Sequence, residues 1–254
     1  MSKSTFSKYA GKVAVVTGAS SGIGQAIAEL LVKNGVIVAG VARRVERVQE
    51  HSNQLKKLPG KLHALKADLT KPEEIITVFK KITEELGPIY ILINNAGLLQ
   101  ACNIIDGDYE KWKTTLDTNV LAMALACREA IKNMKEHNIK GHIINMNSVV
   151  GHQITYFPGL NVYPASKFAV TALTETLRLE INNAKLPIKI TSVSPGYVKT
   201  EFVEVAWGKD GSQKFEQMPG LNSEDIADAV EYVLKTPDHV NIKELTLSVQ
   251  GEQF

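Results

Sequence analysis

The fold is decided by residues 13–35, which read VAVVTGASSGIGQAIAELLVKNG. This stretch begins with the apolar run Val13–Val16, continues through a turn rich in glycine and serine, and ends with apolar residues at helical spacing. A continuous apolar run is typical of a strand buried on both faces, as in a parallel sheet covered by helices. The stretch therefore predicts a strand, a tight turn and a helix, in that order.

Charged residues are missing from three stretches of the chain, and this pattern extends the prediction. Residues 13–28, 86–105 and 141–166 contain no Asp, Glu, Lys or Arg. Each stretch holds a short apolar run followed by small or polar residues. In a parallel sheet the segments that follow the strands gather at the carboxyl edge, where α/β folds bind their ligands. These segments are therefore predicted to form the functional site.

The rest of the chain alternates between apolar runs and segments of helical periodicity. Further strands are predicted over 36–42, 61–67, 188–194 and 245–249. Helices are predicted over 22–34, 43–57, 71–86, 108–137, 164–184 and 223–235. We therefore expect an α/β fold in one domain, residues 1–254, built on a doubly wound parallel sheet of about seven strands with helices on both faces.

Residues at the ends of these segments support the helix predictions. Thr70 and Asn222 are candidate N-caps, and Pro72 suits the first turn of a helix. Gly35 and Gly87 follow helix ends, where glycine is favoured.

Composition excludes several classes of protein. The 29 basic and 27 acidic side chains give a net charge of +2, so neither nucleic acid nor an acidic membrane is an expected partner. Two cysteines, Cys102 and Cys127, cannot form a disulfide framework and lack metal-ligand spacing. Residues 1–12 lack the apolar core of a secretory signal, and no run of about 18 apolar residues suggests a membrane span. We expect a cytoplasmic protein without a bound metal.

Glycines in the first turn predict a phosphate-binding site. Gly18, Gly22 and Gly24 lie between a predicted strand and a predicted helix, where the backbone can approach a pyrophosphate and the helix N-terminus favours its charge. Their spacing, G-x3-G-x-G, differs from the common G-x-G-x-x-G fingerprint. A tight turn without a ligand is the alternative interpretation.

The end of the second predicted strand favours NADP(H) over NAD(H). A site for NAD usually places an acidic residue here to bind the ribose 2′-hydroxyl, whereas this chain has Ala42, Arg43 and Arg44. A guanidinium group suits a 2′-phosphate. The alternative is a solvated basic start to the next helix, which also contains Arg47.

A third group of residues suggests acid–base chemistry. Tyr163 and Lys167 are four residues apart in a predicted helix, so their side chains share a face. A nearby ammonium group is expected to lower the pKa of the tyrosine and make proton exchange practical. Ser148 follows the strand that contains Ile143 and can reach a substrate oxygen. By itself, a Y-x-x-x-K pair is common on ordinary helices.

Together these motifs make the chain resemble the short-chain dehydrogenase/reductase family, whose members are single-domain Rossmann-like oxidoreductases. The resemblance extends from about residue 12 to residue 249. The motifs that carry it, in order, are Thr17–Gly24, Asp68-Leu69, Asn94-Asn95-Ala96-Gly97, Asn119, Ser148, Tyr163 with Lys167, and Pro195-Gly196 with Thr200.

The resemblance implies a catalytic set of four residues. Tyr163 would exchange a proton with the substrate, and Ser148 would orient the substrate oxygen. Lys167 would bind the nicotinamide ribose and lower the tyrosine pKa, and Asn119 would position a water that links Lys167 to solvent.

The resemblance also implies a site for NADP(H). Gly18, Ser20 and Ile23 would line the pyrophosphate and the adjacent ribose. Asp68 and Leu69 would hold the adenine, while residues 95–97 would lie beneath the adenosine ribose. The expected cofactor-binding residues are Gly18, Ser20, Ser21, Gly22, Ile23, Gly24, Arg43, Arg44, Asp68, Leu69, Asn95, Ala96, Gly97, Tyr163, Lys167, Pro195, Gly196, Val198 and Thr200.

The substrate is expected to be a small lipophilic alcohol or its aldehyde or ketone. Residues 149–162 and 201–221 contain many apolar side chains, and in the family the second segment covers the substrate. The Ala42-Arg43 turn and the segment 161–167 are similar to farnesol-dehydrogenase-like members, which favours a farnesol-type isoprenoid alcohol. A steroid or ecdysteroid reductase and a general carbonyl reductase are alternatives. The apolar residues could also simply pack the loops.

Two other classes of function remain open at this stage. A non-catalytic protein that senses the cofactor would keep the nucleotide site without turnover. Binding of nucleic acid through Arg43, Arg44 and Arg47 is a weaker hypothesis. The resemblance further implies a homodimer or homotetramer built on the helices near 108–137 and 164–184.

Overall fold

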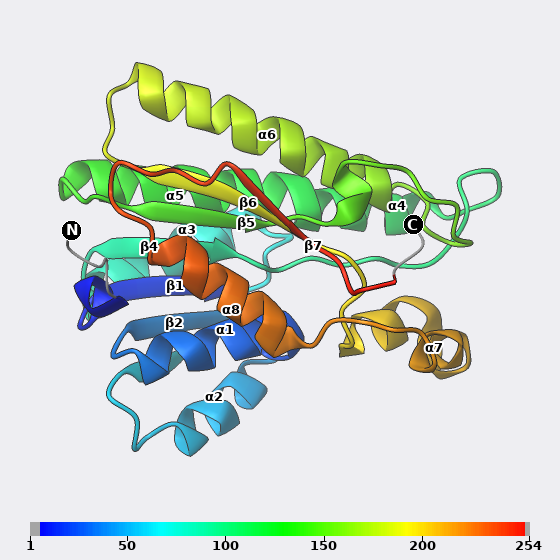
Figure 1. The fold of residues 1–254 in the computed structure, drawn as a ribbon, viewed down its shortest axis with the longest axis horizontal. Helices are drawn as coiled ribbons and strands as arrows, with labels where there is room; N and C mark the ends of the chain where they lie inside the picture. Colours follow the sequence, from blue (N-terminus) through cyan, green and yellow to red (C-terminus); the bar gives the residue numbers. More distant parts are fainter. Residues whose placement is uncertain (1–5, 252–254) are drawn as a thin grey trace.

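A computed structural model describes residues 6–251 of the chain. Its centre is one sheet of seven parallel strands in the order β3-β2-β1-β4-β5-β6-β7 (Figure 1). The strands are β1 Val13–Thr17, β2 Ile37–Ala42, β3 Lys61–Lys66, β4 Ile89–Asn94, β5 His142–Met146, β6 Lys189–Pro195 and β7 Glu244–Leu247. The strand order reverses between β1 and β4, so the predicted doubly wound sheet is confirmed.

Helices cover both faces of the sheet (Figure 1). Their bounds are η1 Phe6–Tyr9, α1 Gly22–Lys33, α2 Val45–Gln54, α3 Pro72–Leu86, α4 Tyr109–Leu116, η2 Asp117–Ala122, α5 Met123–Glu136, η3 Val149–Gly151, α6 Tyr163–Asn183, α7 Glu201–Glu216 and α8 Ser223–Leu234. Apolar side chains of α1, α2 and α8 pack on one face, and those of α3, α5 and α6 pack on the other. Both cores exclude water from the strands, so the strand ends are held rigidly.

Most predicted helix ends are confirmed, but one N-cap is wrong. Asn222 caps α8 in a reciprocal capping box with Asp225, and Pro72 opens α3. The N-cap of α3 is Lys71 rather than Thr70. The hydroxyl of Thr70 donates instead to the carboxylate of Asp68 at 2.8 Å, because a Thr two residues after an Asp completes a local turn more readily.

The long helix predicted over 108–137 is also corrected. It begins with Asp108 as the N-cap of α4, but a π-helical segment, η2, separates α4 from α5. The sequence prediction assumed one continuous α-helix and did not include such a widened turn. π-helical turns often occur at functional sites.

A helix that periodicity did not predict forms within residues 201–221. This helix, α7, is bent at Gly208, whose φ of +75° is outside the helical range. Its apolar residues follow no single stripe, since they contact loops on several sides rather than the sheet. A parallel bridge joins Leu221, at the end of this segment, to Val198, which precedes its start. In Figure 1, α7 projects from the sheet beyond the end of α8.

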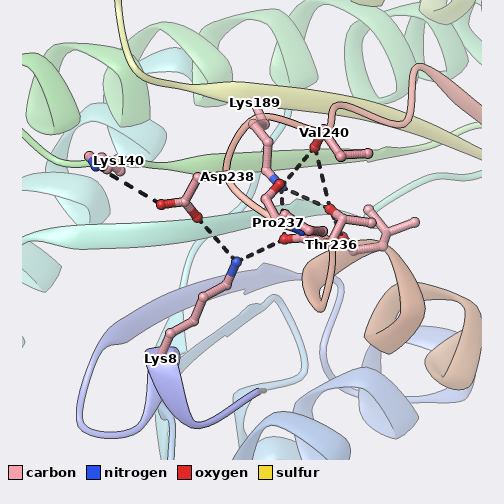
Figure 2. Close-up of polar contacts among 8 residues, drawn as sticks. Lys8, Lys140, Lys189, Thr236, Pro237, Asp238 and Val240 are labelled. Atoms are coloured by element: carbon pink, nitrogen blue, oxygen red, sulfur yellow. Dashed lines mark hydrogen bonds and ion pairs between the residues drawn. The ribbon is translucent and has the colours of Figure 1, made fainter. Parts of the chain in front are cut away.

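At the amino end of β6, Lys189 binds the loop that follows α8 (Figure 2). Its Nζ atom lies 2.9 Å from the hydroxyl of Thr236 and within 3.1–3.4 Å of the carbonyl oxygens of Thr236, Pro237 and Val240. Lys8 donates to the carbonyl of Thr236 as well, at 3.0 Å. The two ammonium groups thus bind backbone carbonyls of the loop that follows α8.

Among residues 6–251, no helix is long and apolar enough to cross a membrane.

Candidate active site

A cavity of about 770 Å³ opens at the carboxyl edge of the sheet. Its walls include the loops after β1, β2, β3, β4, β5 and β6, which are far apart in sequence. The reversal of strand order between β1 and β4 separates the loops there, and this is where doubly wound folds bind ligands.

The first wall of the cavity is the glycine turn after β1. Gly18 has a φ of +67°, and a Cβ atom there would lie 2.9 Å from the Cα of Ala96. Asn95 donates from Nδ2 to the carbonyl of Thr17 at 3.0 Å. Gly24 lies beneath the turn, where a Cβ would be 2.3 Å from the carbonyl oxygen of Gly18. The glycines thus allow two loops to touch and leave the N-terminus of α1 open to the cavity.

Thr17, to which sequence reasoning gave no role of its own, connects these two loops. Its Oγ1 atom donates to the carbonyl of Ile93 and accepts from the backbone N–H groups of Asn95 and Ala96 at 3.0 and 3.1 Å. The side chain is buried. A threonine at the end of a buried strand was the only signal in the sequence.

The two adjacent arginines after β2 lie in different surroundings. Both precede the first residue of α2, which begins at Val45 rather than at the predicted residue 43. Arg43 is exposed on the cavity wall. Arg44 instead donates to Ser21 Oγ at 3.0 Å and to the carboxylate of Glu201 at 3.0 Å.

Ser148 and Tyr163 meet on the opposite wall. Ser148 is the N-cap of η3, two residues after the end of β5, and Tyr163 is the first residue of α6. The Ser148 side chain lies close enough to the Tyr163 hydroxyl to affect its pKa. Removal of the phenol from water raises the pKa of Tyr163, and Ser148 opposes that rise in pKa.

Lys167 lies one helical turn after Tyr163 and is buried. Its Nζ atom donates to the carbonyl of Met146 at 2.9 Å and lies 5.7 Å from the centre of the Tyr163 ring. Burial lowers the pKa of Lys167 to about 8. In the protein alone, desolvation therefore dominates both groups, and the expected lowering of the tyrosine pKa by the ammonium group is not found.

Asn119 supports the site through hydrogen bonds to two of the segments that form it. It lies in η2, where its amide oxygen accepts from Leu98 N at 2.8 Å and its amide nitrogen donates to Leu98 O and Ser166 Oγ at 2.9 and 3.0 Å. Ser166 in turn donates to the carbonyl of Tyr163 at 2.6 Å. The π-helical turn therefore places Asn119 between the loop after β4 and the start of α6. Sequence reasoning did not identify Ser166.

The cavity brings together nearly all of the predicted site residues. Gly24 and Asn119 support its walls from outside the lining. The predicted residues that line it are Gly18, Ser20, Ser21, Gly22, Ile23, Arg43, Arg44, Asp68, Leu69, Asn95, Ala96, Gly97, Ser148, Tyr163, Lys167, Pro195, Gly196, Val198 and Thr200.

Aromatic side chains close the side of the cavity beyond Tyr163. The ring of Phe157 lies 5.5 Å from Trp207 and 4.9 Å from Phe215, measured between ring centres. Trp207 Nε1 donates to the carbonyl of Pro158 at 3.1 Å, and the ring of Phe202 lies 5.7 Å from that of Tyr163. Helix α7 thus packs on the loop 152–162 and forms an apolar wall.

The shape and chemistry of the cavity fit a dinucleotide. The glycine turn offers backbone close to a phosphate position, since a side chain at Gly18 would collide with Ala96. Lys167 keeps N–H donors without acceptors among the described residues, and Thr118 has a buried, unpartnered hydroxyl in the lining. Such donors suit the hydroxyl groups of a ribose.

Comparison with known proteins agrees with this geometry. Residues 12–210 match the family model described as short chain dehydrogenase. The chain therefore belongs to the short-chain dehydrogenase family of oxidoreductases.

Two curated relatives match almost the whole chain. Farnesol dehydrogenase of Aedes aegypti is 47% identical over 249 residues, which cover 97% of this chain and 99% of the relative. The dehydrogenase/reductase SDR family member 11 of Homo sapiens is 40% identical over 253 residues, which cover 97% of each chain.

Solved structures share the fold closely. An alcohol dehydrogenase of the archaeon Thermococcus sibiricus, complexed with 5-hydroxy-NADP, has a TM-score of 0.84 and 28% identity, covering 95% of this chain and 98% of the other. The closed form of a serine dehydrogenase, complexed with NADP+, has a TM-score of 0.84 and 32% identity over the same shares of the two chains.

Proposed function

We propose that this protein is an NADP(H)-dependent oxidoreductase that interconverts a lipophilic alcohol and its aldehyde or ketone, with a farnesol-type isoprenoid alcohol as the favoured substrate. The observation that carries the proposal is the position of Ser148, Tyr163 and Lys167 between a nucleotide-shaped groove and an aromatic wall.

The three polar side chains have distinct roles in this proposal. The Ser148 hydroxyl holds the substrate oxygen, and Tyr163 delivers a proton to that oxygen during reduction or removes one during oxidation. Lys167 binds the nicotinamide ribose with its free N–H donors. Bound NADP(H) supplies the hydride chemistry.

The charge balance of the site changes when the nucleotide binds. In the protein alone, burial raises the pKa of Tyr163 and lowers that of Lys167. Ribose hydroxyls and phosphates close to Lys167 favour its ammonium form, and a charged ammonium stabilises a phenolate. The proposal therefore assigns the tuning of Tyr163 to the complex with the nucleotide rather than to the protein alone.

Arg43 is the proposed partner of the cofactor's 2′-phosphate. It is exposed on the cavity wall beside the adenosine end, and it lies close enough to Asp68 to affect the pKa of that carboxyl group. The two solved structures named above were complexed with NADP-type nucleotides, which also supports NADP(H).

The side chains that line the cavity near Tyr163 favour an apolar substrate. Phe157, Phe202, Trp207 and Phe215 line this end of the cavity together with Leu160. Side chains of this kind bury an aliphatic chain but offer few hydrogen bonds. Among apolar substrates, the 47% identity to a farnesol dehydrogenase supports an isoprenoid alcohol. In this proposal, segment 201–221 covers the substrate.

Nicotinamide absorbance tests the proposal directly. The purified protein is mixed with NADP+ or NAD+ and with farnesol, a short-chain alcohol or a hydroxysteroid, and the reverse reaction is followed with NADPH, the aldehyde and a ketosteroid. We expect NADP-linked turnover that is fastest with farnesol or its aldehyde. Turnover only with ketosteroids would move the assignment to the steroid class. Nucleotide binding without turnover across the panel would instead favour a cofactor sensor.

We also propose a cytoplasmic homo-oligomer. Apolar side chains on α4, η2 and α6 are partly or largely exposed, including Tyr109, Leu121, Phe168 and Leu179. Contact between two copies would bury them. Both cysteines are free, as expected in a reducing compartment. Sedimentation equilibrium tests the assembly, and a monomer at micromolar concentration would contradict it.

A further inference from the structure

Helix α7 begins beside the glycine turn after β1. Thr200 is its N-cap, and a Cβ atom placed on Gly22 would lie 3.0 Å from the Thr200 methyl group. The first residue of α7, Glu201, lines the same cavity as Arg43 and Arg44. The segment proposed to cover the substrate is therefore attached next to the groove proposed for the cofactor.

One carboxylate binds two arginines at this junction. Glu201 accepts from Arg44 at 3.0 Å and from Arg47 at 2.7 and 2.9 Å. Arg44 also donates to Ser21 Oγ at 3.0 Å and approaches Ser20 Oγ at 3.5 Å. Both terminal nitrogens of Arg44 are thus already bonded, one to the glycine turn and one to α7.

Arg43 is placed differently. Its side chain is exposed, and among residues 6–251 its charge acts on Asp68 without a hydrogen bond or an ion-pair contact. An incoming phosphate would meet a guanidinium that no carboxylate holds by a hydrogen bond at Arg43, whereas at Arg44 it would have to displace the carboxylate of Glu201. The two neighbouring arginines therefore suit different tasks.

We infer that Glu201, Arg44 and Arg47 form an ionic clasp that holds the start of the covering segment 201–221 against the glycine turn, and that Arg43 alone binds the 2′-phosphate. The inference rests on the proposed function. Glu201 acts as a positioning residue, since it fixes α7 without contacting the reacting atoms. The pairs are partly exposed, with 41–43% of each side chain accessible, so salt weakens the clasp.

Limited trypsin digestion tests the clasp without any need for turnover. Lys209 is exposed in α7 and becomes a cleavage site when the segment opens. We expect Glu201→Gln to raise the rate of cleavage after Lys209 by about 1.5- to fivefold, the range for exposed ion pairs. The matched control is Glu204→Gln, which removes another carboxylate from the first turn of α7, and its rate should stay at the wild-type value.

The ratio of NADPH to NADH affinity separates the two arginines. Arg43→Gln should lower this ratio at least tenfold and leave cleavage after Lys209 unchanged. Arg44→Gln and Glu201→Gln should change the ratio by less than about twofold but speed cleavage. The double variant should cleave no faster than Glu201→Gln, because that single change already removes both ion pairs.

Two results would overturn the inference. The first is an unchanged cleavage rate in Glu201→Gln, and the second is a loss of NADPH preference in Arg44→Gln as large as that in Arg43→Gln. If wild-type protein binds neither nucleotide, the proposed function fails, while digestion still reports on the clasp.

Discussion

Two lysines at opposite edges of the sheet show which features distinguish a reactive site from a structural one. Burial lowers the pKa of both Lys167 and Lys189 to about 8. Each also borders a cavity, of about 770 Å³ for Lys167 and about 440 Å³ for Lys189. Neither the pKa nor the cavity separates them.

The hydrogen bonds of the two ammonium groups differ. Lys189 has four oxygen acceptors in the loop after α8 (Figure 2), whereas Lys167 has one, the carbonyl of Met146, among the described residues. A satisfied cation stabilises the fold and has no donor left for a ligand. A cation with spare donors beside a hydroxyl pair is available for chemistry.

Of the changes proposed here, replacement of Lys167 should have the largest effect on activity. Lys167→Met is expected to lower kcat/KM by about 10²- to 10⁴-fold, because it removes the cation that supports proton transfer by Tyr163. The fold should persist, since the lysine makes one hydrogen bond to the protein. Steady-state rates and circular dichroism check this result. Activity within tenfold of wild type would remove Lys167 from the mechanism.

Removal of Arg43 tests the other end of the same cavity. Arg43→Ala should weaken NADPH binding by about 1.5–3 kcal/mol, the range for hydrogen bonds to charged groups, and leave NADH binding nearly unchanged. Fluorescence titration with each nucleotide measures both values. An unchanged affinity for NADPH would show that the 2′-phosphate binds elsewhere.

Replacement of Lys189 should give the opposite result to replacement of Lys167. Lys189→Met is expected to reduce the free energy of unfolding by about 1–3 kcal/mol, because the carbonyls of Thr236, Pro237 and Val240 lose their shared donor. Activity should remain within about twofold of wild type. Urea unfolding and steady-state rates provide the two readouts. If the variant is inactive yet fully stable, the distinction between the two edges is wrong.

A smaller effect is expected from pH on the affinity for NADPH. The pKa of Lys167 is lowered to about 8, so its ammonium form predominates at pH 7 and is lost above pH 8. Because the proposal pairs this ammonium with the nucleotide, affinity for NADPH should fall by at most about tenfold between pH 7 and pH 9. Lys167→Met should abolish the slope. A slope equal to that of wild type in Lys167→Met would assign the titration to another group.

The sequence predicted the strands and the motif residues best, because their positions depend on local patterns of residues. Apolar runs located all seven strands, because the strands of a sheet covered by helices are rich in apolar residues, even where polar ones interrupt them, as in β3. The glycines, Ser148, Tyr163 and Lys167 were found by their motifs, and the structure brings them to one cavity.

Other features depend on contacts between distant segments and left no pattern to read. The π-helical turn at Asn119 is connected to Leu98 and Ser166, and α7 packs on loops rather than on the sheet. The different surroundings of Arg43 and Arg44 likewise depend on Glu201, more than 150 residues away. Periodicity does not report such contacts.

The most direct test of the central claim is the rate of NADPH oxidation with farnesol's aldehyde by wild-type protein and by Tyr163→Phe. This substitution removes only the hydroxyl that is proposed to carry the proton. The account predicts NADPH-linked turnover in wild type and a loss of at least about 10²-fold in the variant, with NADPH affinity little changed. Turnover that survives in Tyr163→Phe would contradict the proposed mechanism.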